Sequence, residues 1–207
     1  MVIQELKPSK RVEGRWLAML EDGSILRVGE NEVIDFALYA GKELTEEEAE
    51  ALMASARCGL WKEKALDLLT RKPQSRKELE RKLKEWGAGE ADLAALCDRM
   101  EELGYLNDAA YAAQVVRYYS AKGFGEKRLR DELYRRGIPR ELWDEALDQA
   151  EDPAEAIDAF VAKKLAGKSL DRKELQKVSA ALARRGYSWS DINDALRRYG
   201  AETGEYD

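Results

Sequence analysis

Apolar positions recur along this chain with a period of about fifty residues. Each copy starts with two apolar residues four positions apart, continues to a glycine four positions later, and ends with a second apolar pair. The three copies are Leu79, Leu83, Gly87, Leu93 and Cys97; Leu129, Leu133, Gly137, Trp143 and Leu147; and Val178, Leu182, Gly186, Ile192 and Leu196. A fixed period with helical spacing inside each copy predicts a tandem array of helical units. Such arrays offer long surfaces to large partners more often than they enclose catalytic pockets.

Helix caps and breakers divide each repeat into three predicted helices. The run from Ser75 to Glu78 is a capping box, and Pro73 ends the helix before it. Leu133 and its counterparts in the other repeats are expected in the core. The Gly123-Phe124-Gly125 segment is interpreted as a turn between helices rather than an anion site. The predicted helices are 61–70, 75–86 and 90–103; 108–122, 125–136 and 139–150; and 153–165, 171–185 and 188–199.

The N-terminal segment follows a different pattern. Apolar runs at 15–20 and 25–28 flank Asp22-Gly23, which predicts a β-hairpin, and a strand near 2–6 could join it. A short helix is expected over 32–39, and a capping box at Thr45 opens a second helix to about Ala56. The predicted fold is therefore mainly α, with tandem three-helix repeats in an elongated curved array and a small N-terminal β-hairpin. The predicted parts are 1–60, 61–107, 108–150, 151–200 and a frayed tail at 201–207.

Composition narrows the function classes. No run of residues is apolar and long enough to span a membrane, and two cysteines make no disulfide framework, so a cytoplasmic protein is expected. The chain has no histidine, which removes the commonest acid–base group and metal ligand. Phosphate-loop and dinucleotide-binding glycine motifs are also missing. We therefore expect no metal, no cofactor and no enzymatic activity; a nuclease built on unrecognised carboxylates is the enzymatic alternative.

Charge is unevenly distributed. The net charge is −6, and residues 1–60 hold seven Lys and Arg against twelve Asp and Glu, whereas the repeats are nearly balanced. A basic face must therefore come from segregation around helices, and the middle helix of every repeat is the one that carries cationic clusters. The competing interpretation is solvated charge on amphipathic helices, which is how Glu78, Glu80, Glu132 and Glu174 are read. The candidate partner- or DNA-binding residues are Arg76, Lys77, Arg81, Lys127, Arg128, Arg130, Arg135, Arg184 and Arg185. Arg136 is set aside as a helix C-terminal cap.

One stretch resembles a known family. Gly104-Tyr105-Leu106-Asn107-Asp108 is followed by Tyr111-Ala112, Lys122-Gly123-Phe124-Gly125, Arg128-Leu129, Glu132-Leu133 and Arg136-Gly137-Ile138. This pattern resembles the central signature of the RecX family, bacterial regulators of the RecA recombinase. The first repeat matches through Ser75-Arg76, Glu78-Leu79 and Lys82-Leu83. The resemblance covers about 61–200, and 1–60 resembles an extension that some members carry.

The resemblance implies a function. It implies a monomer that binds in the helical groove of the RecA filament on single-stranded DNA. It also implies inhibition of strand exchange and ATP hydrolysis, and hence a role in homologous recombination, DNA repair and the SOS response. Direct contact with single- or double-stranded DNA would fit some members. The alternative is a stand-alone nucleic-acid-binding helical repeat protein that never touches a recombinase.

Overall fold

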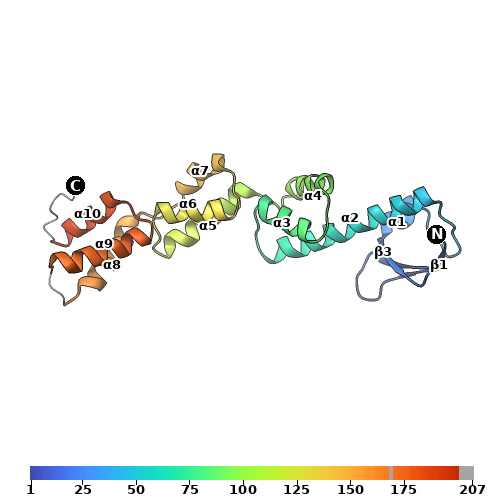
Figure 1. The fold of residues 1–207 in the computed structure, drawn as a ribbon, viewed down its shortest axis with the longest axis horizontal. Helices are drawn as coiled ribbons and strands as arrows, with labels where there is room; N and C mark the ends of the chain where they lie inside the picture. Colours follow the sequence, from blue (N-terminus) through green and yellow to red (C-terminus); the bar gives the residue numbers. More distant parts are fainter. Residues whose placement is uncertain (168–169, 201–207) are drawn as a thin grey trace. The chain divides into compact units, whose positions relative to one another are not determined.

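The structure, a computed structural model, describes residues 1–167 and 170–200, and helices dominate it (Figure 1). The predicted tail at 201–207 lies outside the described residues. Two compact units form: one holds 1–72 and 79–105, and the other holds 73–78 and the residues from Leu106 on. The elements are β1 (Ile3–Pro8), β2 (Arg15–Leu20), β3 (Ile25–Gly29), α1 (Glu30–Asp35), α2 (Glu46–Arg71), α3 (Arg76–Glu85), α4 (Glu90–Glu102), α5 (Asp108–Ala121), α6 (Glu126–Arg135), α7 (Trp143–Leu147), α8 (Pro153–Leu165), α9 (Arg172–Arg184) and α10 (Trp189–Arg198). The predicted mainly α class with a small N-terminal sheet is confirmed.

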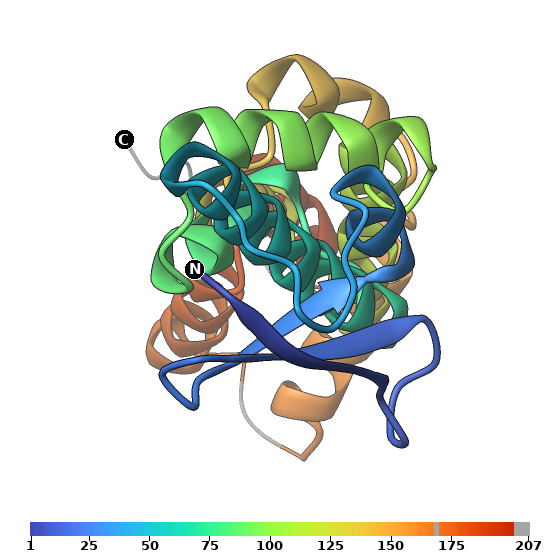
Figure 2. The same ribbon diagram turned by 90° about the vertical axis from the view of Figure 1, so that its right-hand side faces the viewer.

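The N-terminal strands form one antiparallel sheet in the order β1-β2-β3. Gly23 has a φ of +81° in the predicted hairpin turn, where the amide of Leu20 donates to the carbonyl of Ser24 at 2.9 Å. The strand expected near 2–6 is β1. Ile3, Ala18 and Val28 pack with residues of α2 in one buried cluster, so α1 and α2 cover one face of the sheet (Figure 2).

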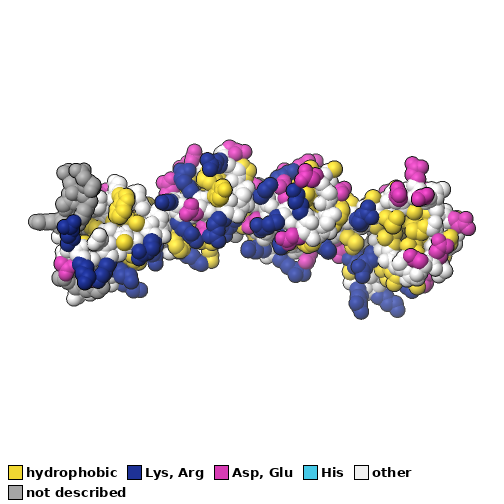
Figure 3. Space-filling view, in the orientation of Figure 1, with side chains coloured by type: hydrophobic (Ala, Val, Ile, Leu, Met, Phe, Trp, Pro, Cys, Tyr) yellow, Lys and Arg dark blue, Asp and Glu magenta, His cyan; other side chains and the backbone are white. Residues whose placement is uncertain are grey.

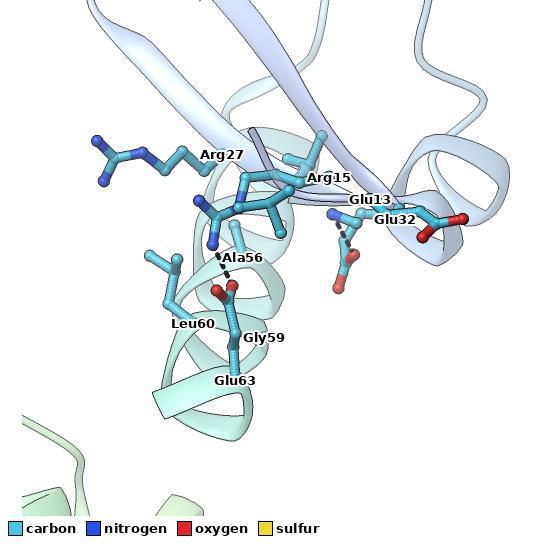
Figure 4. Close-up of a pocket in the computed structure, with 12 residues that line it drawn as sticks. Glu13, Arg15, Arg27, Glu32, Ala56, Gly59, Leu60 and Glu63 are labelled. Carbon is cyan, nitrogen blue, oxygen red and sulfur yellow. Dashed lines mark hydrogen bonds and ion pairs between the residues drawn. The ribbon is translucent and has the colours of Figure 1, made fainter. Parts of the chain in front are cut away.

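Polar contacts fix the sheet to α2 around a small hollow (Figure 4). Arg15 on β2 forms an ion pair with Glu63 on α2. Glu32 on α1 accepts hydrogen bonds from the Gly29 amide at 2.9 Å and from the Ser55 hydroxyl at 2.8 Å. The carboxylates of Glu32 and Glu63 therefore hold neighbouring elements together around this hollow.

The helix α2 corrects a prediction. Two helices were expected, ending at Ala56 and starting at Trp61, but a single helix runs through Gly59. A lone glycine costs a helix only about 1 kcal/mol, and apolar residues on both sides of it are buried. The predicted start and stop are confirmed. Thr45 and Glu48 form the capping box, and Lys72 is extended before Pro73. The part boundary predicted at residue 60 thus falls inside a helix, and the division into parts stays a prediction.

The first helix is shorter than expected and ends unusually. It was predicted over 32–39, but it spans 30–35. Ala37 has a φ of +44°, in the left-handed region. Its amide donates to Ile34 at 3.0 Å, and the amide of Leu38 donates to Val33 at 2.9 Å. These two bonds define a Schellman ending, in which the left-handed position is usually glycine.

Each repeat has its three helices. The first uses the second half of α2 with α3 and α4, the second uses α5, α6 and α7, and the third uses α8, α9 and α10. Leu83, Leu133 and Leu182 are each 0% exposed, which confirms the predicted core register. The Ser75–Glu78 capping box is present, with both bonds at 3.0 Å.

The third helix of the second repeat differs from the prediction. One helix was expected over 139–150, with Pro139 in its first turn. Pro139 instead precedes a 3-10 turn at Arg140–Leu142, and only α7 is α-helical. The indole nitrogen of Trp143 donates to the carbonyl of Ile138 at 2.9 Å, which fixes this turn against the end of α6.

Replacing Ala37 with glycine should stabilise the protein. Left-handed backbone costs an alanine about 1–2 kcal/mol, and the added flexibility of glycine in the unfolded chain offsets part of that. We expect Ala37→Gly to raise the free energy of unfolding by about 0.5–1 kcal/mol in urea titrations. Ala40→Gly, without a positive φ to relieve, should not gain stability. Equal effects of the two changes would contradict this account of Ala37.

Truncation of Leu133 should be costly because its side chain is fully buried. We expect Leu133→Ala to lower the free energy of unfolding by about 2–5 kcal/mol. The neighbouring Tyr134 is exposed, so Tyr134→Ala should change it by less than about 0.5 kcal/mol. A loss below half a kcal/mol at Leu133 would mean that the repeat register is wrong.

Candidate functional site

The middle helices of the second and third repeats meet end to end. At the start of α6, the Gly125 amide donates to the carbonyl of Arg185 at 2.9 Å, and the Lys127 amide donates to that of Gly186 at 3.1 Å. The amides that begin a helix lack partners inside it, as do the carbonyls that end one. The end of α9 therefore satisfies the start of α6. The prediction of a turn at Gly123–Gly125 is confirmed, because a protein carbonyl holds the amide that an anion would need.

The other end of α6 meets residues 73–78, which belong to the same compact unit as the second repeat. The hydroxyl of Ser75 donates to the carbonyl of Arg136, the last residue of the α6 region. The amide of Arg76 donates to the carboxylate of Asp108 at 2.8 Å. A Cβ on Gly137 would lie 2.5 Å from Cγ of Lys77, so only glycine allows this approach. The candidates Arg76 and Lys77 thus stand at a joint with the end of α6.

The side chain of Arg136 ties the end of α6 to α5 within the second repeat. Its guanidinium donates to the hydroxyls of Tyr111 at 3.3 Å and Tyr119 at 3.4 Å, and it lies over the Tyr119 ring at 5.5 Å. It also donates to the backbone carbonyl of Glu132 at 3.1 Å, as a helix C-terminal cap does. Setting Arg136 apart from the partner-binding candidates is consistent with these contacts.

Arg185 has the corresponding place at the joint between α6 and α9. Its guanidinium donates to the carbonyl of Gly123 at 3.2 Å and lies over the rings of Phe160 at 4.7 Å and Phe124 at 5.9 Å. The side chain of this candidate is therefore engaged in holding the third repeat to the second.

Glu132 is the residue that sequence reasoning missed. It was interpreted as a solvated carboxylate, but the residue is 2% exposed. Three arginines surround it: Arg128 at 2.9 Å, Arg135 at 2.9 Å and Arg136 at 2.5 Å. Their spacing at −4, +3 and +4 from Glu132 is visible in the sequence. This spacing does not by itself predict that Glu132 is buried, because the burial of Glu132 depends on α5, which packs against α6.

The arginines decide the ionisation of this carboxylate. Burial by itself raises the pKa of Glu132, but the hydrogen bond and charge of Arg136, with the charges of Arg135 and Arg128, lower it further than burial raises it. The pKa of Glu132 therefore lies below its ordinary value, and the group is charged at neutral pH. Two candidate residues, Arg128 and Arg135, are anchors of this cluster.

Arg130 is engaged in a separate ion network. It pairs with Glu126 one turn earlier on α6 at 2.7 Å and with Asp144 on α7 at 3.6 Å. These contacts raise the pKa of Arg130, and the hydrogen bond that Arg130 donates to Glu126 contributes most. The network connects the second and third helices of the repeat.

Three candidates keep exposed side chains without an ion pair among the described residues: Arg81 on α3, Lys127 on α6 and Arg184 on α9. Figure 3 shows Lys and Arg side chains over α3 and over α5 and α6, with acidic side chains between them. Each middle helix therefore presents one such cation beside its joint contacts.

The described residues contain no group of three or more His, Cys, Asp or Glu side chains that could hold a metal ion. Among them there is also no helix long and apolar enough to cross a membrane.

Family models match all three repeats. The models describe the first, second and third three-helix domains of RecX, and they match residues 62–100, 107–147 and 150–196. The chain belongs to the RecX family. The resemblance found in the Gly104–Ile138 segment is thereby confirmed, and this RecX family member carries its sheet and α1 before the first matched domain.

Individual relatives agree. The chain is similar to the regulatory protein RecX of Ectopseudomonas mendocina (strain ymp), with 38% identity over 64% of this chain and 90% of the relative. The regulatory protein RecX of Vibrio parahaemolyticus is 36% identical over 65% and 88%. Their names are regulatory rather than enzymatic.

Solved structures show the same fold. A crystal structure of a regulatory protein RecX superimposes with a TM-score of 0.74 and 27% identity, covering 93% of this chain and 98% of that one. RecX from Lactobacillus salivarius gives a TM-score of 0.66 at 23% identity, covering 70% and 97%. The first of these likenesses extends over nearly all of the chain.

Replacing Glu132 should remove a pH-dependent part of the stability. Breaking a buried ion pair costs about 3–5 kcal/mol, and the partly exposed arginines place Glu132→Gln at the lower end. A lowered carboxylate pKa stabilises the fold above the ordinary pKa of 4.5, and this contribution is lost as pH falls through the folded value. Urea titrations should therefore show a large loss at pH 7 that shrinks below pH 4.5.

Glu126→Gln is the matched control, because Glu126 is an exposed partner of Arg130 on the same helix. It should change the free energy of unfolding by less than about 1 kcal/mol at either pH. A loss at Glu132 that is the same at both pH values would contradict the proposed charge state.

Proposed function

We propose that this protein regulates RecA by binding in the groove of the RecA filament on single-stranded DNA and lowering strand exchange and ATP hydrolysis. The observation that carries the proposal is the recurrence of an exposed cation without an ion pair on each middle helix, namely Arg81, Lys127 and Arg184, in a member of the RecX family. A recurring contact suits a recurring partner, and a filament is one.

The distribution of charge supports an exposed basic face. Residues 30–50 contain eight Asp and Glu against one Lys, a net of −7, whereas the whole chain has −6, so the remainder carries +1. The acidity that argues against attraction to an anionic partner is therefore confined to α1, the loop after it and the start of α2. The repeats themselves are electrostatically free to approach an acidic surface or a phosphate backbone.

Multiple repeats favour the polymer over the free subunit. Each repeat adds a contact whose second and later engagements are intramolecular, which raises apparent affinity without any new chemistry. We propose that the monomeric array of repeats contacts more than one RecA subunit in the cytoplasm, with direct DNA contact as a secondary possibility. Stabilising a less active filament state, or blocking growth at an end, would both lower turnover.

A titration of RecA ATP hydrolysis on single-stranded DNA tests this function. The rate should fall at less than one copy of the protein per RecA, because one bound copy occupies several subunits. Binding to assembled filament should also be tighter than binding to DNA-free RecA. A rate that stays flat through a molar excess, together with salt-dependent affinity for naked DNA, would favour the stand-alone nucleic-acid binder.

Charge reversal separates the basic face from the joints. Changing Arg81, Lys127 and Arg184 together to Glu should weaken filament binding roughly tenfold or more, while circular dichroism stays unchanged. Lys10, Arg11 and Lys62 are exposed cations outside the middle helices, and reversing those three is the matched control. Equal losses in both variants would indicate nonspecific attraction rather than a defined face.

A further inference from the structure

The third repeat carries an open apolar groove. It lies between α9 and α10, encloses about 560 Å³, and has Leu175, Leu196 and Trp189 among its lining residues. The indole of Trp189 is 63% exposed, which is unusual for so large an apolar side chain. Leu175 and Leu196 belong to the buried cluster of this repeat, so the groove opens directly onto the core.

The corresponding surface of the second repeat is charged. The two repeats match at a constant offset of 49 positions, from Leu129 to Val178 and from Trp143 to Ile192. Of the eight residues that line the groove, six replace charged residues of the second repeat. These six are Leu175 for Glu126, Gln176 for Lys127, Ser179 for Arg130, Ala180 for Asp131, Trp189 for Arg140 and Asn193 for Asp144.

The replaced residues include the ion network of the second repeat. There Arg130 connects Glu126 on α6 with Asp144 on α7, and so spans the space between the two helices. Ser179 is too short and uncharged to do the same in the third repeat. The network is lost, and an apolar opening takes its place.

The matching space between α6 and α7 of the second repeat indicates what kind of ligand the groove would hold. Tyr187, Asp191 and Ala156 of the third repeat line that space together with Arg130 and Asp144, so helical elements of the following repeat border it. The third matched domain ends at residue 196, and α10 is the last helix that the structure describes. The surface shaped to lie beside a helical neighbour thus has none among the described residues.

One of the two helices that form the groove is basic. Arg172 on α9 lines the groove, and α9 as a whole has four Lys and Arg against Glu174, a net of +3, while α10 is balanced. Acidic side chains are therefore favoured along α9, and apolar ones within the groove. Phosphate is a poor occupant, because most of the lining is uncharged.

We propose that this groove binds a short helical segment of a partner protein that has apolar side chains one turn apart and acidic residues on the flank facing α9. The apolar side chains would insert beside Trp189 and above Leu175 and Leu196, in the manner of helix-in-groove recognition. The site is separate from Arg81 and Lys127, and it does not depend on RecA being the partner.

A peptide titration with the full-length protein tests the proposal. The probe is a labelled amphipathic peptide of about 16 residues with leucines at i, i+3, i+4 and i+7 and glutamates on the flanks. Fluorescence anisotropy should show saturable binding. The same peptide with lysines in place of the glutamates should bind with an affinity at least about tenfold lower. Trp189→Ala should weaken binding of the acidic peptide about tenfold. Tyr105→Ala, which removes an exposed aromatic ring elsewhere, should leave it unchanged.

A second variant copies the charged groove of the second repeat. Ser179→Arg with Asn193→Asp places a cation and a carboxylate where Arg130 and Asp144 stand, so it should fold and should also lose the peptide. Failure of the acidic peptide to bind, or unchanged affinity in Trp189→Ala, would overturn the proposal. It would also be overturned if Trp189→Ala abolished self-association seen by sedimentation, because a second copy would then fill the groove. If the unmodified protein binds the acidic peptide but does not inhibit RecA, that result would count against the proposed function alone.

Discussion

The end-to-end docking of the middle helices is the constraint on which the second unit depends. Carbonyls that end α9 meet amides that begin α6, through Gly125 with Arg185 and Lys127 with Gly186. Without this contact, the carbonyls and the amides would each need water or a side-chain cap as a hydrogen-bond partner. One contact therefore satisfies two helix ends. The opposite partial charges of the two helix ends also favour this arrangement. Joining repeats in this way ties the backbone of one repeat directly to the backbone of the next.

Backbone contact has a strict steric requirement. A Cβ on Gly125 would lie 2.5 Å from the backbone of Gly186, and a Cβ on Gly186 would lie 2.5 Å from the amide of Arg128. The recurring glycines of the second and third repeats therefore serve a joint as well as a helix ending, with φ of +66° at Gly137 and +91° at Gly186. The third repeat differs at the start of its middle helix. At the position of Gly125 it has Glu174, whose amide donates to the carboxylate of Asp171 at 2.9 Å. The longer α9 is thus capped by the side chain of Asp171.

Local signals explain which parts of the fold could be predicted from sequence. Capping boxes at Thr45 and Ser75 and the stop at Pro73 act within a few residues, and each was placed correctly. Continuity of α2 through Gly59 was not predicted, because a mid-helix glycine is a weak breaker whose effect depends on what the flanking turns bury. The left-handed Ala37 carries no sequence signal at all. Among the candidate site residues, their place on the middle helices followed from periodicity. Which of them are engaged at joints, such as Arg185, depends on a contact with Gly123 and Phe160 from other elements, which periodicity does not contain.

The buried Glu132 connects the two joints of the second repeat. It pairs with Arg128, whose backbone touches Gly186 at one joint, and with Arg136, whose carbonyl accepts from Ser75 at the other. The helix α6 thus has a contact at each end, with the end of α9 and with residues 73–78, and a single carboxylate holds the arginine at each end. Both ends of α6 make these contacts inside one compact unit, which holds residues 73–78 and the residues from Leu106 on. The charge cluster therefore holds α6 between the end of α9 and the segment 73–78, while Lys127 on the same helix stays exposed.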